Sequence, residues 1–428
     1  MRHEPWLSVQ ARRRPQRVAL ECGGERVTYG ELEERAAGAA GALAERGVRA
    51  GDRAAIALPA GLDFAVALHA CGRLGAAAVP LDLRQTGRER AARARGVATV
   101  VDAPLDARPA PPEASWEDDG VVLVVHTSGT TAEPKEVPLS FGNVRANAAG
   151  SALALGLDPA ERWLCPLPLT HVGGLMVLLR SVIYGTTAVL LPPPFDAAAV
   201  ADALNRGEAT IVSLVPTMLA RVLDAGLEHP PRLRCALLGG GPLDPALAAR
   251  AVRAGVPVAQ TYGLTEACSQ VTVSEPGDPS TAGWPLPGVA VRLAADGEIV
   301  VEGPVVAGGG VLRTGDLGAL DARGRLSVIG RKADTIVTGG ENVAPAEVEA
   351  VLLAHPDVAD AGVYARPHPE WGEAVRAKVV ARAGTTLEPA ALRAWCSARL
   401  APYKVPKAFE TVSALPRTAS GKLLRRQL

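Results

Sequence analysis

The sequence has no long apolar run that is free of charge. Its longest apolar stretches carry Arg180, in LMVLLRSVIYG, and Asp63 with Arg73, in GLDFAVALHACGRLG. A membrane span built from either stretch would place an ionised side chain in hydrocarbon, which is costly. Residues 1–20 also lack the apolar core of a signal peptide. We therefore expect no insertion into a membrane.

Neither sign of charge dominates, and lysine is scarce. The chain has 45 Lys and Arg against 45 Asp and Glu, so no overall field would gather nucleic acid. Only six of the basic residues are lysine, and two of these, Lys135 and Lys422, lie in glycine-containing loops. A lysine kept against such an arginine bias indicates a position that favours a compact charge on a flexible stem.

Cysteine occurs six times but never as a CxxC pair. This scatter argues against a zinc site or a disulfide framework, and it suits a reducing cytoplasm. We expect the cysteines to be small buried hydrophobic residues.

Short apolar runs that end in Gly, Pro or Asp alternate with segments of helical spacing. This pattern is typical of buried parallel strands joined by helices, and it predicts an α/β fold with layered βαβ sheets. A helix is expected at 28–47. Strands are expected at 52–59, 76–82, 97–102, 121–126, 187–192, 210–216, 235–240 and 256–262.

The character of the chain changes after about residue 285. Residues 289–303 alternate around a D-G turn, which predicts an antiparallel hairpin and a small β subdomain. Further on, helices are expected at 344–358 and 387–406 and strands at 360–367 and 373–383. We place a boundary near 330–334, which divides a large N-terminal domain (1–330) from a smaller α+β domain (331–428). The Pro-rich segment 107–120 is expected to be an exposed connector.

The stretch VVLVVHTSGTTAEPKEVPLS (121–140) follows a buried-looking strand with small hydroxyls, a glycine and a lysine. Backbone N–H and side-chain O–H groups at a strand tip are suited to wrapping phosphate oxygens. Lys135 would add charge for the outer phosphates. The common GxxxxGK[ST] loop does not fit, because Pro134 instead of glycine directly precedes Lys135 and Glu136 follows it. On these residues alone, both a phosphate site and a flexible surface turn are supported.

Four further stretches have residues suited to a nucleotide. Glycines 239–241 follow an apolar run, where a flat ligand can approach the backbone. Tyr262 offers a ring for stacking and Glu266 a ligand for Mg²⁺. Asp316 lies in an expected turn, and Lys422 precedes a basic tail. Each stretch also fits an ordinary role: a tight turn, a capped helix start, an Asx-turn and a solvated tail.

Together and in this order, these stretches resemble the superfamily of acyl- and aryl-CoA synthetases, non-ribosomal peptide synthetase adenylation domains and beetle luciferases. The resemblance covers nearly the whole chain, from VTYGELEERA to PRTASGKLLRR. Within the superfamily, the sequence is most similar to the o-succinylbenzoate–CoA ligases of menaquinone biosynthesis. That similarity lies in LPLTHVGGLMVLLRSVIYGTTAVLL, TYGLTEACSQVTVS and TGGENVAPAEVEAVL.

The resemblance implies a ligase that uses ATP, Mg²⁺ and CoA to form first an acyl-adenylate and then a thioester. It implies that Lys422, in a mobile C-terminal domain, bridges the acid carboxylate and the α-phosphate, and that Glu266 holds Mg²⁺. The implied phosphate contacts are Thr127, Ser128, Gly129, Thr130, Thr131, Lys135 and Thr265. Those to adenine are Gly239, Gly240, Gly241, Tyr262 and Gly263, and those to ribose are Asp316 and Arg331.

The resemblance also implies sites for CoA and the acid. Gly339 and Gly340 would line a tunnel for the pantetheine arm, and His171, with Gly173 near it, would stand where acid and thiol meet. Arg180 is costly on an apolar helix unless it meets an anion, so we expect it to receive the succinyl carboxylate. A packed or capping role for His171 and an internal salt bridge for Arg180 stay open.

Three positions depart from the superfamily pattern. Ala132 and Glu136 replace glycines of the usual TGxPKGV, and Ala333 replaces a polar hinge residue. A carboxylate beside pyrophosphate is unfavourable unless it points away.

The remaining alternatives are a ligase for another aromatic or medium-chain acid, and a domain that binds an adenylate or loads a carrier protein. The expected partners are the acid, ATP and CoA; a homodimer is left open, and a cytoplasmic location is expected.

Overall fold

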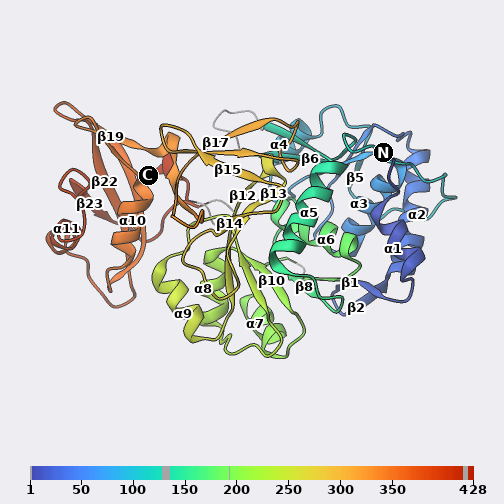
Figure 1. Ribbon diagram of the computed structural model, residues 1–428, viewed down its shortest axis with the longest axis horizontal. Coiled ribbons are helices and arrows are strands. Elements are labelled where there is room, and N and C mark those ends of the chain that lie inside the picture. Colours follow the sequence, from blue (N-terminus) through green and yellow to red (C-terminus); the bar gives the residue numbers. More distant parts are fainter. Residues whose placement is uncertain (1, 128–134, 192, 418–422) are drawn as a thin grey trace.

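The computed structural model describes residues 2–127, 135–191, 193–417 and 423–428 (Figure 1). Several residues on which the sequence predictions fall lie outside these ranges: Ser128, Gly129, Thr130, Thr131, Ala132 and Lys422. Within the described ranges, no helix has both the length and the apolarity needed to cross a bilayer.

The first sheet of the larger part has the strand order β5-β3-β4-β6-β7. Neighbouring strands are parallel except β6 and β7, which are antiparallel. The strands are β3 (Arg53–Ile56), β4 (Ala77–Pro80), β5 (Thr99–Val101), β6 (Val121–Thr127) and β7 (Lys135–Ser140).

The second sheet has the order β14-β13-β12-β11-β10-β8-β9-β1-β2. Its central strands, from β9 to β12, are parallel and largely buried, as runs of Val, Leu and Ala predict. The strands are β1 (Val18–Cys22), β2 (Glu25–Thr28), β8 (Arg162–Cys165), β9 (Thr187–Leu190), β10 (Ile211–Leu214), β11 (Cys235–Leu238), β12 (Val258–Leu264), β13 (Ser269–Val273) and β14 (Trp284–Pro285).

Helices pack against both sheets, and capping boxes at Thr28–Glu31 and Thr86–Glu89 open α2 and α4. Helix α5 contacts β7 of the first sheet and β13 of the second, and α6 packs beside it (Figure 1). The helices are α1 (Trp6–Arg13), α2 (Tyr29–Glu45), α3 (Leu62–Leu74), α4 (Gly87–Arg93), α5 (Phe141–Leu155), α6 (Val172–Tyr184), α7 (Ala197–Asn205), α8 (Pro216–Asp224) and α9 (Pro245–Arg253).

The rest of the chain forms two smaller sheets. The first is antiparallel: β15 (Ala290–Leu293), β16 (Glu298–Glu302), β17 (Val311–Leu320) and β18 (Leu326–Arg331). The last sheet has its own core under two helices and lies at the opposite end of the molecule from the N-terminus (Figure 1). Its elements are β19 (Ile336–Thr338), β20 (Glu341–Val343), α10 (Pro345–Leu353), β21 (Val358–His368), β22 (Gly372–Ala381), α11 (Pro389–Ser397) and β23 (Ala408–Thr411). Short 3-10 helices are η1 (Thr265–Ala267), η2 (Lys332–Asp334) and η3 (Arg425–Gln427).

The predicted α/β architecture is confirmed. Each expected strand and helix named above is present, and the 289–303 hairpin is antiparallel. All six cysteines are free thiols, and five of them are buried, as expected. The position of the domain boundary at 330–334 stays a prediction.

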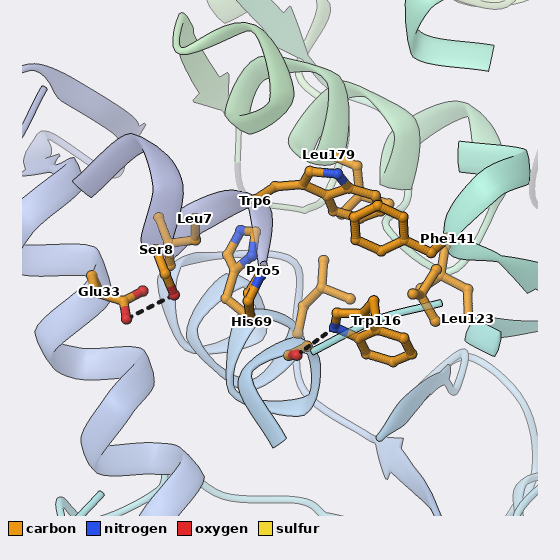
Figure 2. Close-up of a pocket in the computed structure, with 13 residues that line it drawn as sticks. Pro5, Trp6, Leu7, Ser8, Glu33, His69, Trp116, Leu123, Phe141 and Leu179 are labelled. Carbon is orange, nitrogen blue, oxygen red and sulfur yellow. Dashed lines mark hydrogen bonds between the residues drawn. The ribbon is translucent and has the colours of Figure 1, made fainter. Parts of the chain in front are cut away.

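The prediction of an exposed connector at 107–120 is wrong for Trp116. This residue is only 5% exposed, and its Nε1 donates to the Gly72 carbonyl at 2.8 Å. Figure 2 shows Trp116 near Phe141, Leu123 and His69, around a cavity of about 30 Å³. That volume suits about two water molecules. An indole ring has a large apolar surface that favours burial. The sequence prediction relied on the prolines of 107–120 and did not take this tryptophan into account.

Candidate active site

The expected nucleotide residues come together at the carboxyl ends of parallel strands, where α/β sheets commonly bind ligands. Strands β11 and β12 are neighbours, so the glycines after β11 lie beside the end of β12. The first residue of β7, Lys135, pairs with Thr127 at the end of β6. Contacts between β7 and η1 connect the ends of the two sheets.

Lys135 and Glu266 make this connection directly. The Nζ atom of Lys135 lies 3.5 Å from Oε1 of Glu266, which belongs to η1 just after β12. The Lys135 side chain is 62% exposed, so it is accessible to a ligand. The residue expected at the outer phosphates and the residue expected at Mg²⁺ therefore face each other.

Glu266 fits a magnesium ion that arrives with ATP. Among the described residues, no group of three His, Cys, Asp or Glu side chains could hold a metal ion by itself. Mg²⁺ commonly takes only one or two protein carboxylates and fills its remaining positions with water and substrate phosphates. A single carboxylate beside the lysine expected at the outer phosphates matches that requirement.

The residues expected at adenine and ribose form one hydrogen-bonded group. The Tyr262 hydroxyl donates to Oδ2 of Asp316 at 2.8 Å. Arg331 Nε lies 2.8 Å from Oδ1 of the same carboxylate, and β17 pairs with β18 at these two positions. Burial and the nearby carboxylate raise the pKa of Tyr262, so its hydroxyl remains a donor. The carboxylate expected at the ribose is therefore already oriented by two neighbours.

The glycines of the site have different reasons for being glycine. A Cβ atom at Gly263 would lie 1.6 Å from the carbonyl oxygen of Ser269, so only glycine fits the β12–β13 hairpin. Gly240 has φ of +80°, which favours glycine, and Gly241 faces open space. The open position at Gly241 leaves the backbone accessible to a flat ligand.

Glu136, the unusual carboxylate of the phosphate loop, points away from Lys135. Successive residues of a strand project to opposite faces, and Glu136 accepts a hydrogen bond from Arg53 Nη1 at 2.8 Å. Its other oxygen lies 3.8 Å from His126 Nε2. Because the Glu136 carboxylate points away from Lys135, it would not oppose the binding of pyrophosphate there.

His171 stands at the start of α6 and makes no side-chain capping bond there, so the capping alternative is wrong. Its side chain reaches the surface. Partial loss of water around the ring, together with the nearby Arg84 guanidinium, lowers the pKa of His171, and the Asp82 carboxylate opposes this effect. The imidazole is therefore neutral near pH 7. The sequence analysis missed Asp82 and Arg84, which form an ion pair at 2.7 Å, although Asp82 is the last residue of an expected strand and Arg84 follows two positions later.

Arg180 is buried inside the larger part, with 1% of its surface exposed. Its Nη2 donates to Asn147 Oδ1 of α5 at 2.5 Å, and its guanidinium lies over the Trp163 ring at 5.7 Å. No carboxylate of the described residues lies within ion-pair distance, so the salt-bridge alternative is wrong for that part of the chain. Burial lowers the pKa of Arg180, yet a guanidinium stays charged.

Unpaired polar atoms accompany this buried charge. Arg180 Nε, Gln270 Oε1 and Ser151 Oγ have no hydrogen-bond partner in the described structure. Asn147 Nδ2 donates to the Gln270 carbonyl at 2.8 Å and so ties α5 to β13. Buried polar atoms are usually satisfied, so the unpaired Arg180 Nε is a donor that lacks an acceptor in the described structure. Asn147 and Gln270 were missed because an isolated amide in a helix or strand carries no sequence signal.

The structure does not place the predicted CoA glycines beside the nucleotide residues. Gly339 and Gly340 form the two-residue turn of the β19–β20 hairpin, with φ of +60° and +84°. That hairpin lies in the last sheet, away from β6 and β12 (Figure 1). Positive φ at both turn positions by itself favours glycine, and both residues face open space. Gly173 is the second residue of α6, two positions after His171, and a Cβ atom there would lie 3.3 Å from Leu167.

Family models match most of the chain. The AMP-binding enzyme model matches residues 7–103 and 94–310, and the AMP-binding enzyme C-terminal domain model matches residues 347–422. A 2-succinylbenzoate–CoA ligase from Bacillus cereus is 39% identical to the chain, with 99% of this chain and 97% of the relative covered.

The fold also matches solved structures of o-succinylbenzoate CoA synthetase (MenE) from Bacillus subtilis. Its complex with the acyl-adenylate intermediate OSB-AMP gives a TM-score of 0.93 at 38% identity, covering 100% of this chain and 98% of the other. Its complex with ATP and magnesium ion also gives 0.93 at 38% identity, with both chains fully covered. A double mutant bound with the product analogue OSB-NCoA gives only 0.73, at 37% identity and coverage of 100% and 98%.

By overall TM-score, the present structure is therefore more similar to the complexes with ATP and with OSB-AMP than to the double mutant. With matches over residues 7–310 and 347–422, and 39% identity along nearly its full length, this chain belongs to the AMP-binding enzyme family.

Proposed function

We propose that the protein is an AMP-forming acid–CoA ligase of menaquinone biosynthesis. It would convert 2-succinylbenzoate, ATP and CoA into 2-succinylbenzoyl-CoA, AMP and pyrophosphate. The observation that carries this proposal is the pairing of Lys135 with Glu266 and of Tyr262 with Asp316, in a chain similar throughout to a 2-succinylbenzoate–CoA ligase.

In the first step, a carboxylate oxygen of the acid attacks the α-phosphorus of ATP. The bond from that phosphorus to the oxygen bridging to the β-phosphate breaks, and pyrophosphate leaves. Both reactants are anions, so fixed positive charge and hydrogen-bond donors must offset their repulsion. Lys135 supplies charge at the outer phosphates, Thr127 and Thr265 supply hydroxyls, and a magnesium ion held by Glu266 would neutralise phosphate charge. The predicted contacts at 128–131 lie outside the described residues.

Lys422 completes this step by placing its ammonium group between the carboxylate and the α-phosphate. The residue itself is not described, but the peptide bond joins it to Leu423 of the last sheet's tail. We divide the chain into a part that binds nucleotide and acid, 1–330, and a part that carries Lys422, 331–428. The Bacillus subtilis structures match this chain with TM-scores of 0.93 and 0.73 at nearly the same identity, which supports rotation of one part against the other near Ala333.

In the second step, the CoA sulfur attacks the carbonyl carbon of the adenylate, and AMP leaves. Gly339 and Gly340 would lie along the pantetheine arm after this rotation. A turn without Cβ atoms leaves space for the narrow arm and its thiol to pass. The neutral His171 stands where acid and thiol would meet, with Gly173 beside it.

Arg180 is proposed to bind the succinyl carboxylate. A buried guanidinium with an unpaired Nε gains most from a carboxylate, because such a pair restores the interaction lost on leaving water. The remaining acid alternatives, other aromatic or medium-chain acids, differ from 2-succinylbenzoate in lacking this second carboxylate or its spacing.

The alternative of a domain that only binds an adenylate or loads a carrier protein depended on the altered phosphate loop. Glu136 binds Arg53 instead of facing Lys135, so the described part of that loop no longer favours it. A homodimer and a cytoplasmic location stay predictions.

Pyrophosphate exchange into ATP across a panel of carboxylic acids tests the proposal. We expect exchange with 2-succinylbenzoate at the highest kcat/KM, and 2-succinylbenzoyl-CoA once CoA is added. Exchange without thioester formation, or a clear preference for a monocarboxylate, would contradict it.

Lys422→Ala tests the division of labour, with Lys378→Ala as a matched control in the same domain. Lys378 lies in β22, and its Nζ is 3.7 Å from Oε1 of Glu410. Lys422→Ala should abolish exchange yet retain transfer from preformed acyl-adenylate to CoA, whereas Lys378→Ala should change neither. Equal loss of both half-reactions in Lys422→Ala would exclude the assigned role.

A further inference from the structure

The chain is fastened to strand β21 on both sides of Lys422. Arg417 and Leu423 form an antiparallel bridge, and the Leu424 amide donates to the Pro416 carbonyl at 2.8 Å. Arg417 Nη2 lies 2.7 and 2.8 Å from the two carboxylate oxygens of Asp360, in β21. The residues on either side of 418–422 are therefore held in place; we call Pro416, Arg417, Leu423 and Leu424 the base of this segment.

Arg425 holds the C-terminal side of this base through three elements. It pairs with Glu349 of α10, donates to the Val363 carbonyl of β21 at 2.7 Å, and lies 3.2 Å from Asp334 Oδ2 of η2. Glu349 in turn accepts from the Val363 amide at 2.7 Å. The planar guanidinium thus links a helix, a strand and the segment that enters the last sheet.

Close apolar packing supports the same base. A Cβ atom at Gly362, in the middle of β21, would lie 2.9 Å from Leu428, 3.3 Å from Leu423 and 3.4 Å from Leu415. The tail therefore lies directly on the strand, and a larger residue at Gly362 would push the Leu428 side chain aside.

Asp334 matters because of where it stands. It follows Ala333, and the residue before Ala333, Lys332, binds Asp296 at 2.6 Å and Glu298 at 3.1 Å in the β15–β16 hairpin. The chain is therefore anchored to the larger part just before Ala333 and to the tail, through Arg425, just after it. Any rotation at Ala333 would carry the base of the Lys422 segment with it.

We propose that Arg425 is a positioning residue for adenylate formation, which fixes the chain that follows Lys422 to α10, to β21 and to Asp334 beside the expected hinge. The inference rests on the proposed function, because it assumes that Lys422 acts in the first step. Arg425 touches no reactant; it acts by holding the backbone three residues from the lysine. A displacement of 1 Å in a catalytic group can lower a rate about a hundredfold.

Arg425→Met and Arg425→Lys test this role, with Arg382→Met as a control, since Arg382 is an exposed arginine just after β22. In Arg425→Met, kcat for pyrophosphate exchange should fall about ten- to a hundredfold, while KM for ATP changes less than about twofold. Transfer from preformed acyl-adenylate to CoA should fall much less. Arg425→Lys, which keeps the charge but not the fork, should lie between Arg425→Met and wild type, and Arg382→Met should match wild type.

Hydrogen exchange of the Leu424 amide gives a readout that is independent of activity. We expect faster exchange in Arg425→Met, because the base that holds the Leu424 bond to Pro416 opens. Hydrogen exchange at Leu424 that is the same in Arg425→Met and wild type would overturn the proposal. If wild type is active and Arg425→Met has the same rate of pyrophosphate exchange, the proposal is overturned as well. Equal loss of both half-reactions, in step with a lower melting temperature, would show a merely structural role and would overturn it too. If wild type activates no acid while Leu424 still opens in Arg425→Met, the proposed function fails and the anchoring stands.

Discussion

Arg180→Met should weaken binding of the acid while leaving the nucleotide site intact. The substitution keeps a long unbranched side chain in α6 but removes the buried guanidinium and its bond to Asn147. If Arg180 binds the succinyl carboxylate, a hydrogen bond between two charged groups is lost, worth about 1.5–3 kcal/mol. At 1.4 kcal/mol for each factor of ten, KM for 2-succinylbenzoate should rise about 10- to 150-fold.

The stability of the variant should change far less than its KM. Removing the guanidinium leaves Asn147 Oδ1 without its donor, which costs about 1–3 kcal/mol. It also removes a charge buried without a carboxylate partner, and replacing buried charge by apolar atoms is often neutral or stabilising. These effects oppose each other, so we expect the melting temperature to shift only slightly.

Steady-state pyrophosphate exchange separates the two substrates. KM for ATP should stay within about twofold of wild type, because Lys135 and Asp316 are untouched. Benzoate, which lacks the second carboxylate, should lose no affinity in the variant. Arg88→Met, an exposed arginine in α4, is the control. Equal rises in KM for ATP and for the acid, or no rise, would refute the assignment of Arg180.

Three other changes test separate features. Gly263→Ala should lower the free energy of unfolding by about 3 kcal/mol in urea titration, because its Cβ would overlap the Ser269 carbonyl; a stable variant would contradict this packing. Glu136→Gln should leave KM for ATP within about twofold, because Glu136 faces Arg53, and a tenfold lower KM would show repulsion of pyrophosphate after all. Burial lowers the pKa of His69 to about 4, so the unfolded chain takes up its proton first as pH falls below 6.5. Stability should then decrease by about 2 kcal/mol between pH 7 and pH 5, and His69→Gln should flatten that dependence; an unchanged pH profile would exclude the role of His69.

Much of the site could be predicted because short motifs fix local geometry. Apolar runs that end in glycine or hydroxyl residues mark strand ends, and the order of these ends along the chain indicates an α/β sheet with a ligand at its edge. Tyr262 and Glu266 were identified in this way, and the structure brings each into contact with another predicted residue. Asp316 was expected in a turn, and that prediction is wrong, because the residue lies within strand β17 and pairs there with Arg331 of β18. Trp116 shows where prediction from local composition fails. The Pro-rich composition of 107–120 predicted an exposed connector, whereas the Trp116 side chain is buried.

The sequence by itself determined the alternation of strands and helices, the family and the types of residue that meet a nucleotide. Only the tertiary structure decided which of these residues meet, such as Lys135 with Glu266 across 131 positions. It also decided that Glu136 turns to Arg53, that Arg180 lies buried beside Asn147, and that Arg425 reaches Asp334. Local structure follows from the spacing of neighbouring residues, whereas a charge finds its partner only after distant segments have packed and excluded the water between them.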